Sequence, residues 1–188
     1  MLNINDMKYK FFSLMDRMMQ GVGAVTMQTY TEVNIKRGVQ YEASVVFTIP
    51  VGESVDLVYI AGSTPVTIKG REVFFTGEQI TFEIFKNPTY TGGTSIPVYN
   101  LTQINPVAAK SSLLGGATVT DSGTKILADR VLLGSTSSGN KTSPTESVEG
   151  LEHVFEANTT YLERITNNNG DAAKVSVYLT WYEGDLDF

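Results

Sequence analysis

Two kinds of hydrophobic periodicity divide the chain. Between residues 7 and 19, apolar side chains recur three and four positions apart, which predicts a helix with one apolar stripe. Gly21 and Gly23 follow the stripe and end the helical pattern. From residue 30 onward, β-branched and aromatic residues alternate with polar ones between Gly, Pro, Asn and Asp. We therefore expect a helical arm at residues 1–29 and an all-β domain at residues 30–188.

The strand pattern also predicts the core and the fold class. Residues 57–60 are a nearly continuous apolar run, which predicts a strand covered on both faces. Alternation elsewhere predicts half-buried strands, and the last one should turn Ser176, Tyr178, Thr180 and Tyr182 away from the core. About ten short strands fit a two-sheet sandwich of jelly-roll type with a short N-terminal helix or arm. The expected core residues are Val45, Phe47, Ile49, Ile80, Phe82, Ile84, Val177, Leu179 and Trp181.

Two segments are candidates for contacts with other molecules. Residues 134–144 form an eleven-residue run without an apolar side chain, so we expect a loop at a rim or contact surface. The N-terminal stripe contains flexible methionines, which favour an adaptable contact surface. The stripe either packs on its own domain or docks on another subunit. Its members are Met7, Phe11, Leu14, Met15 and Met18.

Composition excludes several classes of function. The chain has 188 residues, of which 41% are hydrophobic, so a core can form without disulfides or a structural metal. It has no cysteine and one histidine, which excludes thiol catalysis, Cys-ligated zinc and any multi-histidine metal centre. A net charge of -6 without clustered basic residues disfavours nucleic-acid binding. No apolar stretch reaches the roughly 18 residues of a membrane span, and no secretory signal is expected.

The remaining candidates for chemistry each have a simpler structural interpretation. His153 could act as a general base or a lone metal ligand, but no nucleophile motif accompanies it, so a strand or rim position is expected. Glu83 and Glu163 could form a glycosidase-like carboxylate pair, although ordinary solvated strand positions explain both. Residues 167–171 resemble a calcium loop, yet Asn-Gly between two strands predicts a hairpin turn whose residues accept positive φ. We expect no catalytic residue, no cofactor and no metal site.

Surface aromatics could hold sugars or anchor a protein interface, or their rings could pack on neighbouring strands. The tyrosines expected to be accessible are Tyr90, Tyr99, Tyr161, Tyr178 and Tyr182.

Six segments in order resemble a group of small virion proteins of tailed bacteriophages, of the capsid decoration or head-stabilising type. They are GVQY at 38–41, PTYTGGT at 88–94, PVYNL at 97–101, DSGT at 121–124, YLERITN at 161–167 and VSVYLTWYE at 175–183. The resemblance covers most of the chain from residue 38 to 183, and the N-terminal stripe lies outside it. It carries over no binding residue.

The resemblance implies a non-enzymatic, homo-oligomeric β protein that binds the major capsid protein on the capsid surface, after assembly in the host cytoplasm. Many identical weak contacts add up on a shell, so such a role suits an interaction module. We expect the N-terminal stripe to supply the capsid contact, with residues 134–144 as a second one. The alternatives are a neck or tail component of the virion, a carbohydrate-binding sandwich that contacts a receptor, and a glycosidase.

Overall fold

The computed structural model describes residues 30–134 and 153–184, which form one short helix and fourteen strands. The predicted helix over residues 7–19 lies outside the described residues. The elements in chain order are α2 (Tyr30–Arg37), β1 (Gln40–Ile49), β2 (Ser54–Ile60), β3 (Val66–Phe75), β4 (Gln79–Lys86), β5 (Thr89–Thr91), β6 (Thr94–Ile96), β7 (Tyr99–Asn100), β8 (Ser112–Gly115), β9 (Thr118–Asp121), β10 (Thr124–Lys125), β11 (Arg130–Leu133), β12 (His153–Phe155), β13 (Thr160–Asn167) and β14 (Ala173–Glu183).

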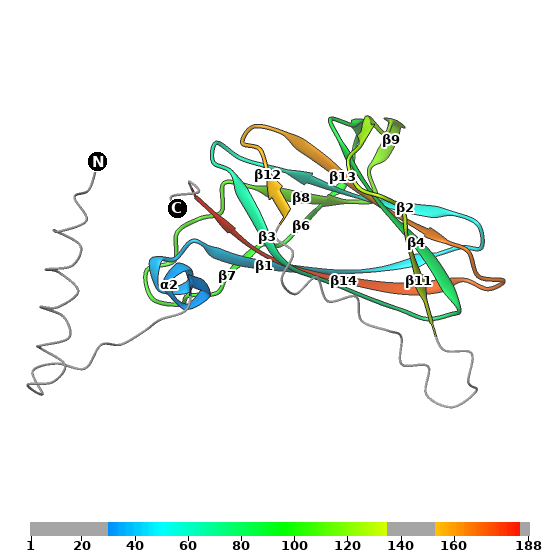
Figure 1. The fold of residues 1–188 in the computed structure, drawn as a ribbon, viewed down its shortest axis with the longest axis horizontal. Helices are drawn as coiled ribbons and strands as arrows, with labels where there is room; N and C mark the ends of the chain where they lie inside the picture. The colour runs from blue at the N-terminus through cyan, green and yellow to red at the C-terminus, as the bar shows by residue number, and fades with distance from the viewer. Residues whose placement is uncertain (1–29, 135–152, 185–188) are drawn as a thin grey trace, which may run out of the picture. The chain divides into compact units, whose positions relative to one another are not determined.

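Twelve of the strands form two antiparallel sheets packed face to face, and β5 and β9 pair separately. One sheet has the order β12-β3-β14-β1-β7, and the other has the order β10-β4-β13-β2-β8-β6 with β11 also paired to β4. Figure 1 shows them as layers, with β1 and β14 in the lower layer and β2 and β13 in the upper one. Eight of these strands form two four-stranded arrays, β12-β3-β14-β1 in the first sheet and β2-β13-β4-β11 in the second. Along these eight strands the chain crosses repeatedly from one sheet to the other. This is the jelly-roll arrangement, so the predicted fold class is confirmed.

The core lies between the inward faces of the two sheets. Of the nine predicted core residues, seven are buried, and Val45 and Phe47 are partly buried against them. The alternation of β14 is also as predicted, because Val175, Val177, Leu179 and Trp181 all belong to this core. Aromatic rings fill one part of it: Trp181 contacts Tyr41 and Tyr59 at centroid distances of 6.0 and 5.5 Å. The hydrophobic pattern therefore places the inward side chains correctly.

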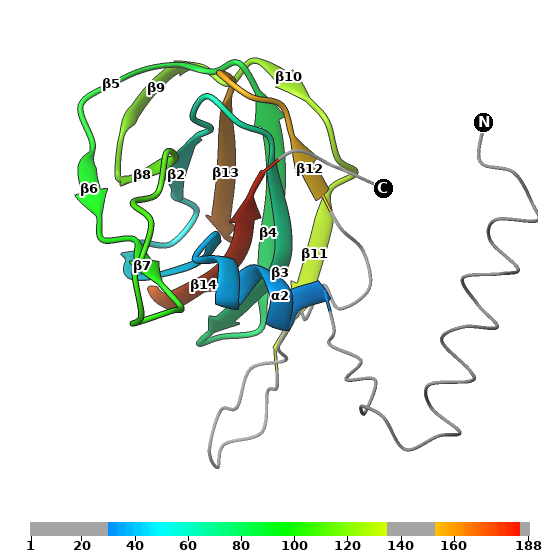
Figure 2. The same ribbon diagram turned by 90° about the vertical axis from the view of Figure 1, so that its left-hand side faces the viewer.

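β2 is covered on both faces, as its continuous apolar run predicts. Leu57 and Tyr59 point into the main core, whereas Val58 belongs to a second apolar cluster on the outer side of the seven-stranded sheet. β5 and β9 pair with each other, and their residues Tyr90 and Val119 pack on that cluster. Figure 2 shows this two-stranded sheet beside β2 and β8. We call β5 and β9 the outer flap.

The chain from residue 30 begins with a helix, where period-two strand patterning was expected. α2 ends in Lys36 and Arg37, and basic residues are favourable near the negative end of a helix dipole. Gly38 follows with a φ of 74°, and its N–H donates to Ile35 O while the N–H of Val39 donates to Asn34 O. These two hydrogen bonds form a Schellman motif, a helix C-terminus that requires a left-handed residue and so favours glycine. The expectation of strand patterning from residue 30 is therefore wrong for the first eight residues.

The connection between β13 and β14 is not the predicted hairpin, because β13 belongs to the seven-stranded sheet and β14 to the five-stranded one. Neither Asn169 nor Gly170 is among the described residues with positive φ. The side chain of Asn167 shapes the turn instead, because its amide donates to the carbonyl oxygens of Ile49, Pro50 and Asp171. A buried side chain that bridges two connections therefore replaces the local turn chemistry.

Within residues 30–134 and 153–184, the structure contains no helix whose length and hydropathy would allow it to cross a membrane.

Candidate functional site

The structure does not test the residues predicted to contact the capsid. Met7, Phe11, Leu14, Met15 and Met18 lie outside the described residues, as does the loop beyond Gly134. Gly134 itself is held at the end of β11, where its N–H donates to Glu78 O at 2.7 Å. The arm and loop contacts therefore stay predictions.

Glu83 and Glu163 lie on neighbouring strands but on opposite faces of the seven-stranded sheet. Glu83 is level with Arg164 on the outer face, so Glu163, one residue earlier, points into the core. There it accepts hydrogen bonds from Nε and Nη2 of Arg71 at 3.1 and 2.5 Å. The two carboxylates therefore do not converge on a shared cleft.

The expectation that Glu163 is solvated is wrong. Its side chain is 0% exposed and that of Arg71 is 1% exposed, so they form a buried ion pair that joins the two sheets. The reason is that β13 is a central strand covered on both sides. Leu162, the neighbour of Glu163, fills the apolar cluster beneath the outer flap, which leaves the glutamate facing the core.

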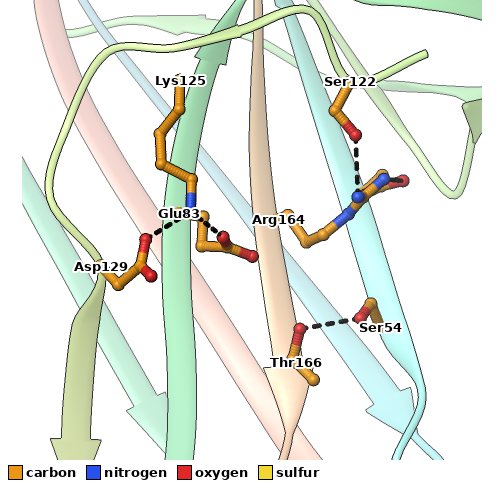
Figure 3. Close-up of polar contacts among 8 residues, drawn as sticks. Ser54, Glu83, Ser122, Lys125, Asp129, Arg164 and Thr166 are labelled. Atoms are coloured by element: carbon orange, nitrogen blue, oxygen red, sulfur yellow. Dashed lines mark hydrogen bonds and ion pairs between the residues drawn. The ribbon is translucent and has the colours of Figure 1, made fainter.

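An open part of the outer face of the seven-stranded sheet carries a row of charged side chains (Figure 3). Arg164 on β13 donates from Nε and Nη2 to the two carboxylate oxygens of Asp56 on β2, at 2.8 and 2.9 Å. Its Nη1 donates to Ser122 Oγ at 2.9 Å, which ties the turn after β9 to the sheet. The hydrogen bond with Asp56 raises the pKa of the Arg164 guanidinium. All three guanidinium nitrogens are therefore engaged within the protein.

The same row continues across β4 and β10. Lys125 Nζ donates to Glu83 and to Asp129 at 2.6 Å each (Figure 3), and these bonds, with Asp129 the larger cause, raise the pKa of the lysine. Acids and bases alternate along the row, and each charge has an opposite neighbour. The arrangement joins loops to strands and offers no uncompensated acid or base to a substrate.

The histidine and asparagine candidates occupy structural positions. His153 pairs with Ile68 at the edge of the five-stranded sheet and lines an apolar pocket of about 160 Å³. Asn169 Oδ1 accepts from the backbone N–H groups of Glu78 and Gln79 at 2.5 and 2.7 Å. Since this oxygen is aimed at protein donors, it is not arranged as a cation ligand. In the part of the chain that the structure describes, no group of three or more His, Cys, Asp or Glu residues could hold a metal.

Three of the five tyrosines expected at the surface are covered. Tyr161 and Tyr182 are buried, and Tyr90, on β5 of the outer flap, is partly buried against the apolar cluster that the flap covers. Tyr99 and Tyr178 lie on the outer face of the five-stranded sheet, and both adjoin Glu42: Tyr99 pairs with it across strands, and the Tyr178 hydroxyl donates to its Oε2 at 2.6 Å. That hydrogen bond and burial raise the pKa of Tyr178 to about 12.

Exposed apolar side chains lie on both sheets, for example Val131 and Leu133 on β11 and Val154 on β12, and two further groups stand out. The first comprises Tyr99 and residues of the loop after β7: Ile104 is 79% exposed, Tyr99 61% and Val107 47%. We call these three side chains the Ile104 knob. The loop is also free of charge, since residues 101–109 contain no Asp, Glu, Lys or Arg. Large apolar side chains that gather in solvent are typical of protein contact sites.

The second place is a surface depression of about 210 Å³ lined by Val46, Phe74, Phe75, Thr76, Lys174 and Ser176. Ser176 on β14 lies between Val46 on β1 and Phe74 on β3, so a small side chain separates two larger ones. Val46 is 65% exposed and Phe74 is 40% exposed. We call this depression the Val46 hollow.

Neither the knob nor the hollow was predicted from the sequence. The available signals were interruptions of the alternation, because Val46 lies between Val45 and Phe47, and Phe74 precedes Phe75. An unbroken apolar pair or triplet places one apolar residue on the outward face of a half-covered strand. The uncharged run at residues 101–109 is the corresponding signal for the loop.

Comparisons with known proteins give little beyond this geometry. No protein-family model and no curated protein matches the chain. Among solved structures, it is similar to the structure of infectious bursal disease virus Gx strain at 13% identity, over 77% of this chain and 46% of that one, with a TM-score of 0.12. The crystal structure of the infectious bursal disease virus VP2 subviral particle matches at 13% identity, over 78% and 39% of the two chains, with a TM-score of 0.11. The chain spans less than half the length of either viral protein, and TM-scores this low support no inference about fold or function.

Proposed function

We propose that this protein is a non-enzymatic virion structural protein that binds and stabilises the assembled capsid of a tailed phage. The six segments that resemble decoration and head-stabilising proteins support the proposal. All six contain residues of strands, among them β7, β13 and β14. The jelly roll agrees with this role, since viral capsid domains and lectins share it, although a fold alone does not specify a function.

The observation that carries the proposal is the contrast between the polar and the apolar surface. On the outer face of the seven-stranded sheet, Arg164 and Lys125 are paired with acids of the same chain. Large apolar side chains face solvent instead: Val46 and Phe74 on the five-stranded sheet, Ile104 in the loop after β7, and Val131 and Leu133 on β11. Charges matched internally and apolar groups left exposed favour binding to another protein surface rather than chemistry on a substrate.

The proposed partner is the major capsid protein, and the proposed contact is the N-terminal stripe of Met7, Phe11, Leu14, Met15 and Met18 with residues 134–144. Co-sedimentation with empty capsids tests this contact. A variant that begins at Ala24 should keep the circular dichroism and unfolding temperature of the full chain but no longer sediment with shells. Unchanged occupancy would place the attachment surface on the sandwich, and an unfolded variant would show that the stripe is ordinary core.

Quantitative proteomics of purified virions tests the location. A copy number comparable to that of the major capsid protein supports decoration of the capsid surface. A copy number far below it would assign the protein to the neck or tail, and absence from virions would contradict the proposal. Turnover of a polysaccharide or peptide library that disappears in Glu83→Gln would contradict the non-enzymatic role.

A second candidate function is carbohydrate binding at a receptor. It is favoured by Tyr99 and Tyr178, which adjoin Glu42 on an open sheet face, because rings offer apolar surface and a carboxylate accepts hydrogen bonds from hydroxyl groups. A glycan array measures this directly. Binding that is lost in Tyr99→Ala and kept in Tyr90→Phe, which changes a residue of the outer flap, would support the second candidate.

A further inference from the structure

The side-chain amide of Asn169 joins two connections of the sandwich. It lies between β13 and β14, and its Oδ1 accepts hydrogen bonds from the backbone N–H groups of Glu78 and Gln79, at 2.5 and 2.7 Å. Its Nδ2 donates to Asn167 Oδ1 at 2.6 Å. Figure 1 shows the β3–β4 and β13–β14 connections at the same end of the sandwich. Because both backbone groups are donors, the oxygen of the amide must face them, and its orientation is fixed.

The residue that follows Asn169 is a glycine with an accessible backbone. Asn169 and Gly170 line a polar pocket of about 310 Å³, and Gly170 is exposed. A Cβ built on Gly170 would meet no atom within 4 Å. Among the described residues, none accepts a hydrogen bond from the Gly170 N–H. Water and base can therefore reach this nitrogen.

Asparagine followed by glycine is a reactive pair. The backbone nitrogen after an asparagine can attack the side-chain Cγ, which closes a five-membered succinimide ring. Glycine favours this attack because it has no Cβ to hinder the nitrogen. Asn169-Gly170 is the only such pair in the chain. The sequence therefore supplies the electrophile and the nucleophile as neighbours at one place.

The fold adds a stabilising environment for the charge that this attack creates. As the nitrogen bonds to Cγ, negative charge develops on Oδ1, the atom at which the N–H groups of Glu78 and Gln79 point. Two backbone donors aimed at such an oxygen form an oxyanion hole, and losing one donor of this kind slows acyl-transfer enzymes by about 10²–10³. Hydrogen bonds that strengthen as the charge grows lower the barrier. The folded chain should therefore react faster than the sequence pair alone.

We propose that Asn169 is a site of spontaneous modification, at which the folded protein converts this asparagine to aspartate or isoaspartate. The Gly170 nitrogen loses its proton to base and bonds to Asn169 Cγ. The Cγ–Nδ2 bond then breaks, and Nδ2 leaves as ammonia after taking up a proton. Water opens the succinimide at either of its carbonyl groups, so the net reaction consumes water, releases ammonia and needs no redox partner.

The modification changes both charge and geometry at the junction of the two connections. Aspartate keeps an acceptor for Glu78 and Gln79 but no longer donates to Asn167 Oδ1. It also adds a carboxylate to a pocket that Glu78 and Asp171 already line, and like charges at close range repel. Isoaspartate lengthens the main chain by one atom as well. The modified chain should therefore unfold at a lower temperature, and Asn169→Asp should reproduce the part of the shift that is due to charge.

Peptide mapping by mass spectrometry measures the reaction on the purified full chain, incubated at neutral pH. Deamidation raises the mass of the peptide that contains residue 169, and its aspartate and isoaspartate forms are separated by chromatography. The reference is the same chain unfolded in urea, where Asn169 and Gly170 remain neighbours but the two donors are removed. The folded chain should react at least about tenfold faster. A folded rate equal to or below the unfolded rate would overturn the proposal.

Variants at three positions test the individual steps. Gly170→Ala fits without a contact and should slow the reaction, because its Cβ hinders the attacking nitrogen. Gly77→Ala would place a Cβ 2.6 Å from Asn169 Cγ, which displaces the amide from its donors, and Glu78→Pro removes one donor. Both should bring the folded rate down toward the unfolded one. Gly92→Ala is the matched control for Gly77→Ala, because it also has a positive φ but no neighbour within 4 Å, and it should leave the rate unchanged.

Circular dichroism establishes that each variant is folded before its rate is compared. A wild-type rate in Gly170→Ala would contradict attack by the glycine nitrogen. A wild-type rate in folded Gly77→Ala or Glu78→Pro would contradict the role of the two donors. The proposal goes beyond the virion role and does not depend on it, because Asn169 can be modified in a protein that binds no capsid, and a capsid-binding protein can keep Asn169 intact.

Discussion

The buried pair of Arg71 and Glu163 allows a sharp test of how the two sheets are joined. Arg71 comes from β3 in one sheet and Glu163 from β13 in the other, and neither side chain has more than 1% of its surface exposed. The guanidinium also lies over the ring of Phe82, with Cζ 5.2 Å from the ring centroid. Glu163→Leu would remove the only described carboxylate that pairs with Arg71 and leave a buried, uncompensated charge. Breaking a buried pair in this way costs about 3–5 kcal/mol.

The double variant Arg71→Met with Glu163→Leu should recover most of that loss. Among the described atoms, Arg71 Nη1 and Glu163 Oε2 have no hydrogen-bond partner, so the pair is incompletely satisfied. Replacing such a pair with apolar residues of similar volume is often neutral or stabilising. We therefore expect the double variant to unfold within about 1 kcal/mol of the wild type, or at a higher free energy, and the coupling energy to exceed about 2 kcal/mol.

Urea unfolding followed by fluorescence measures all four corners of this cycle, because the single tryptophan, Trp181, is buried in the core. Asp129→Asn is the control, since Asp129 is half exposed in its ion pair with Lys125, and such pairs contribute about 1 kcal/mol or less. A loss below about 1 kcal/mol in Glu163→Leu, or additive losses in the double variant, would refute the reasoning.

Three other predictions follow from particular contacts. Phe82→Ala should lower the free energy of unfolding by about 3–5 kcal/mol, because the ring is fully buried between the sheets; a urea curve shifted by less than about 1 kcal/mol would contradict this. Tyr178 should titrate near pH 12 in a difference titration at 295 nm against Tyr178→Phe, and Glu42→Gln should lower that pKa. Because its folded pKa is raised above its ordinary value, the stability that this tyrosine adds is complete below about pH 10 and is lost as pH rises toward 12. Glu183→Ala should lower the free energy of unfolding by at least about 2 kcal/mol. The Glu183 carboxylate accepts hydrogen bonds from Lys110 N, from Ser111 N and Oγ, and from Trp181 Nε1, and the variant leaves these donors without it. An unchanged midpoint of thermal unfolding would show that the donors find other partners.

The local hydrophobic pattern was sufficient to predict the inward face of a strand where only one face is covered. In β14, Val177 and Leu179 alternate with Ser176 and Tyr178, and the structure buries the first pair and turns the second pair outward. The same argument placed Phe82 in the core. These predictions succeed because the side-chain period of a strand is two, so apolar alternation by itself identifies the inward face.

The local pattern failed to predict burial where a segment distant in the sequence covers a strand. No local argument tells which face of β13 carries Leu162 and which carries Glu163. The outer flap, contributed by residues 89–91 and 118–121, decides this, because it gives the leucine apolar cover on the outer face. The glutamate then faces inward, where Arg71, ninety-two residues away, compensates its charge. The Asn167 turn is a similar case, because its amide bonds to Ile49 O across 118 residues.

The sequence by itself therefore determined the all-β class, the jelly-roll sandwich and most of the core, because these follow from short-range periodicity and from the number of strands. Only the tertiary structure decided which surfaces remain open. Val46, Phe74 and Ile104 are apolar in the sequence like any core residue, and their exposure depends on which strands pair and which faces the sheets turn toward each other. Burial is a property of the neighbours that the fold brings together, so a candidate contact surface becomes visible only once the sheets are assembled.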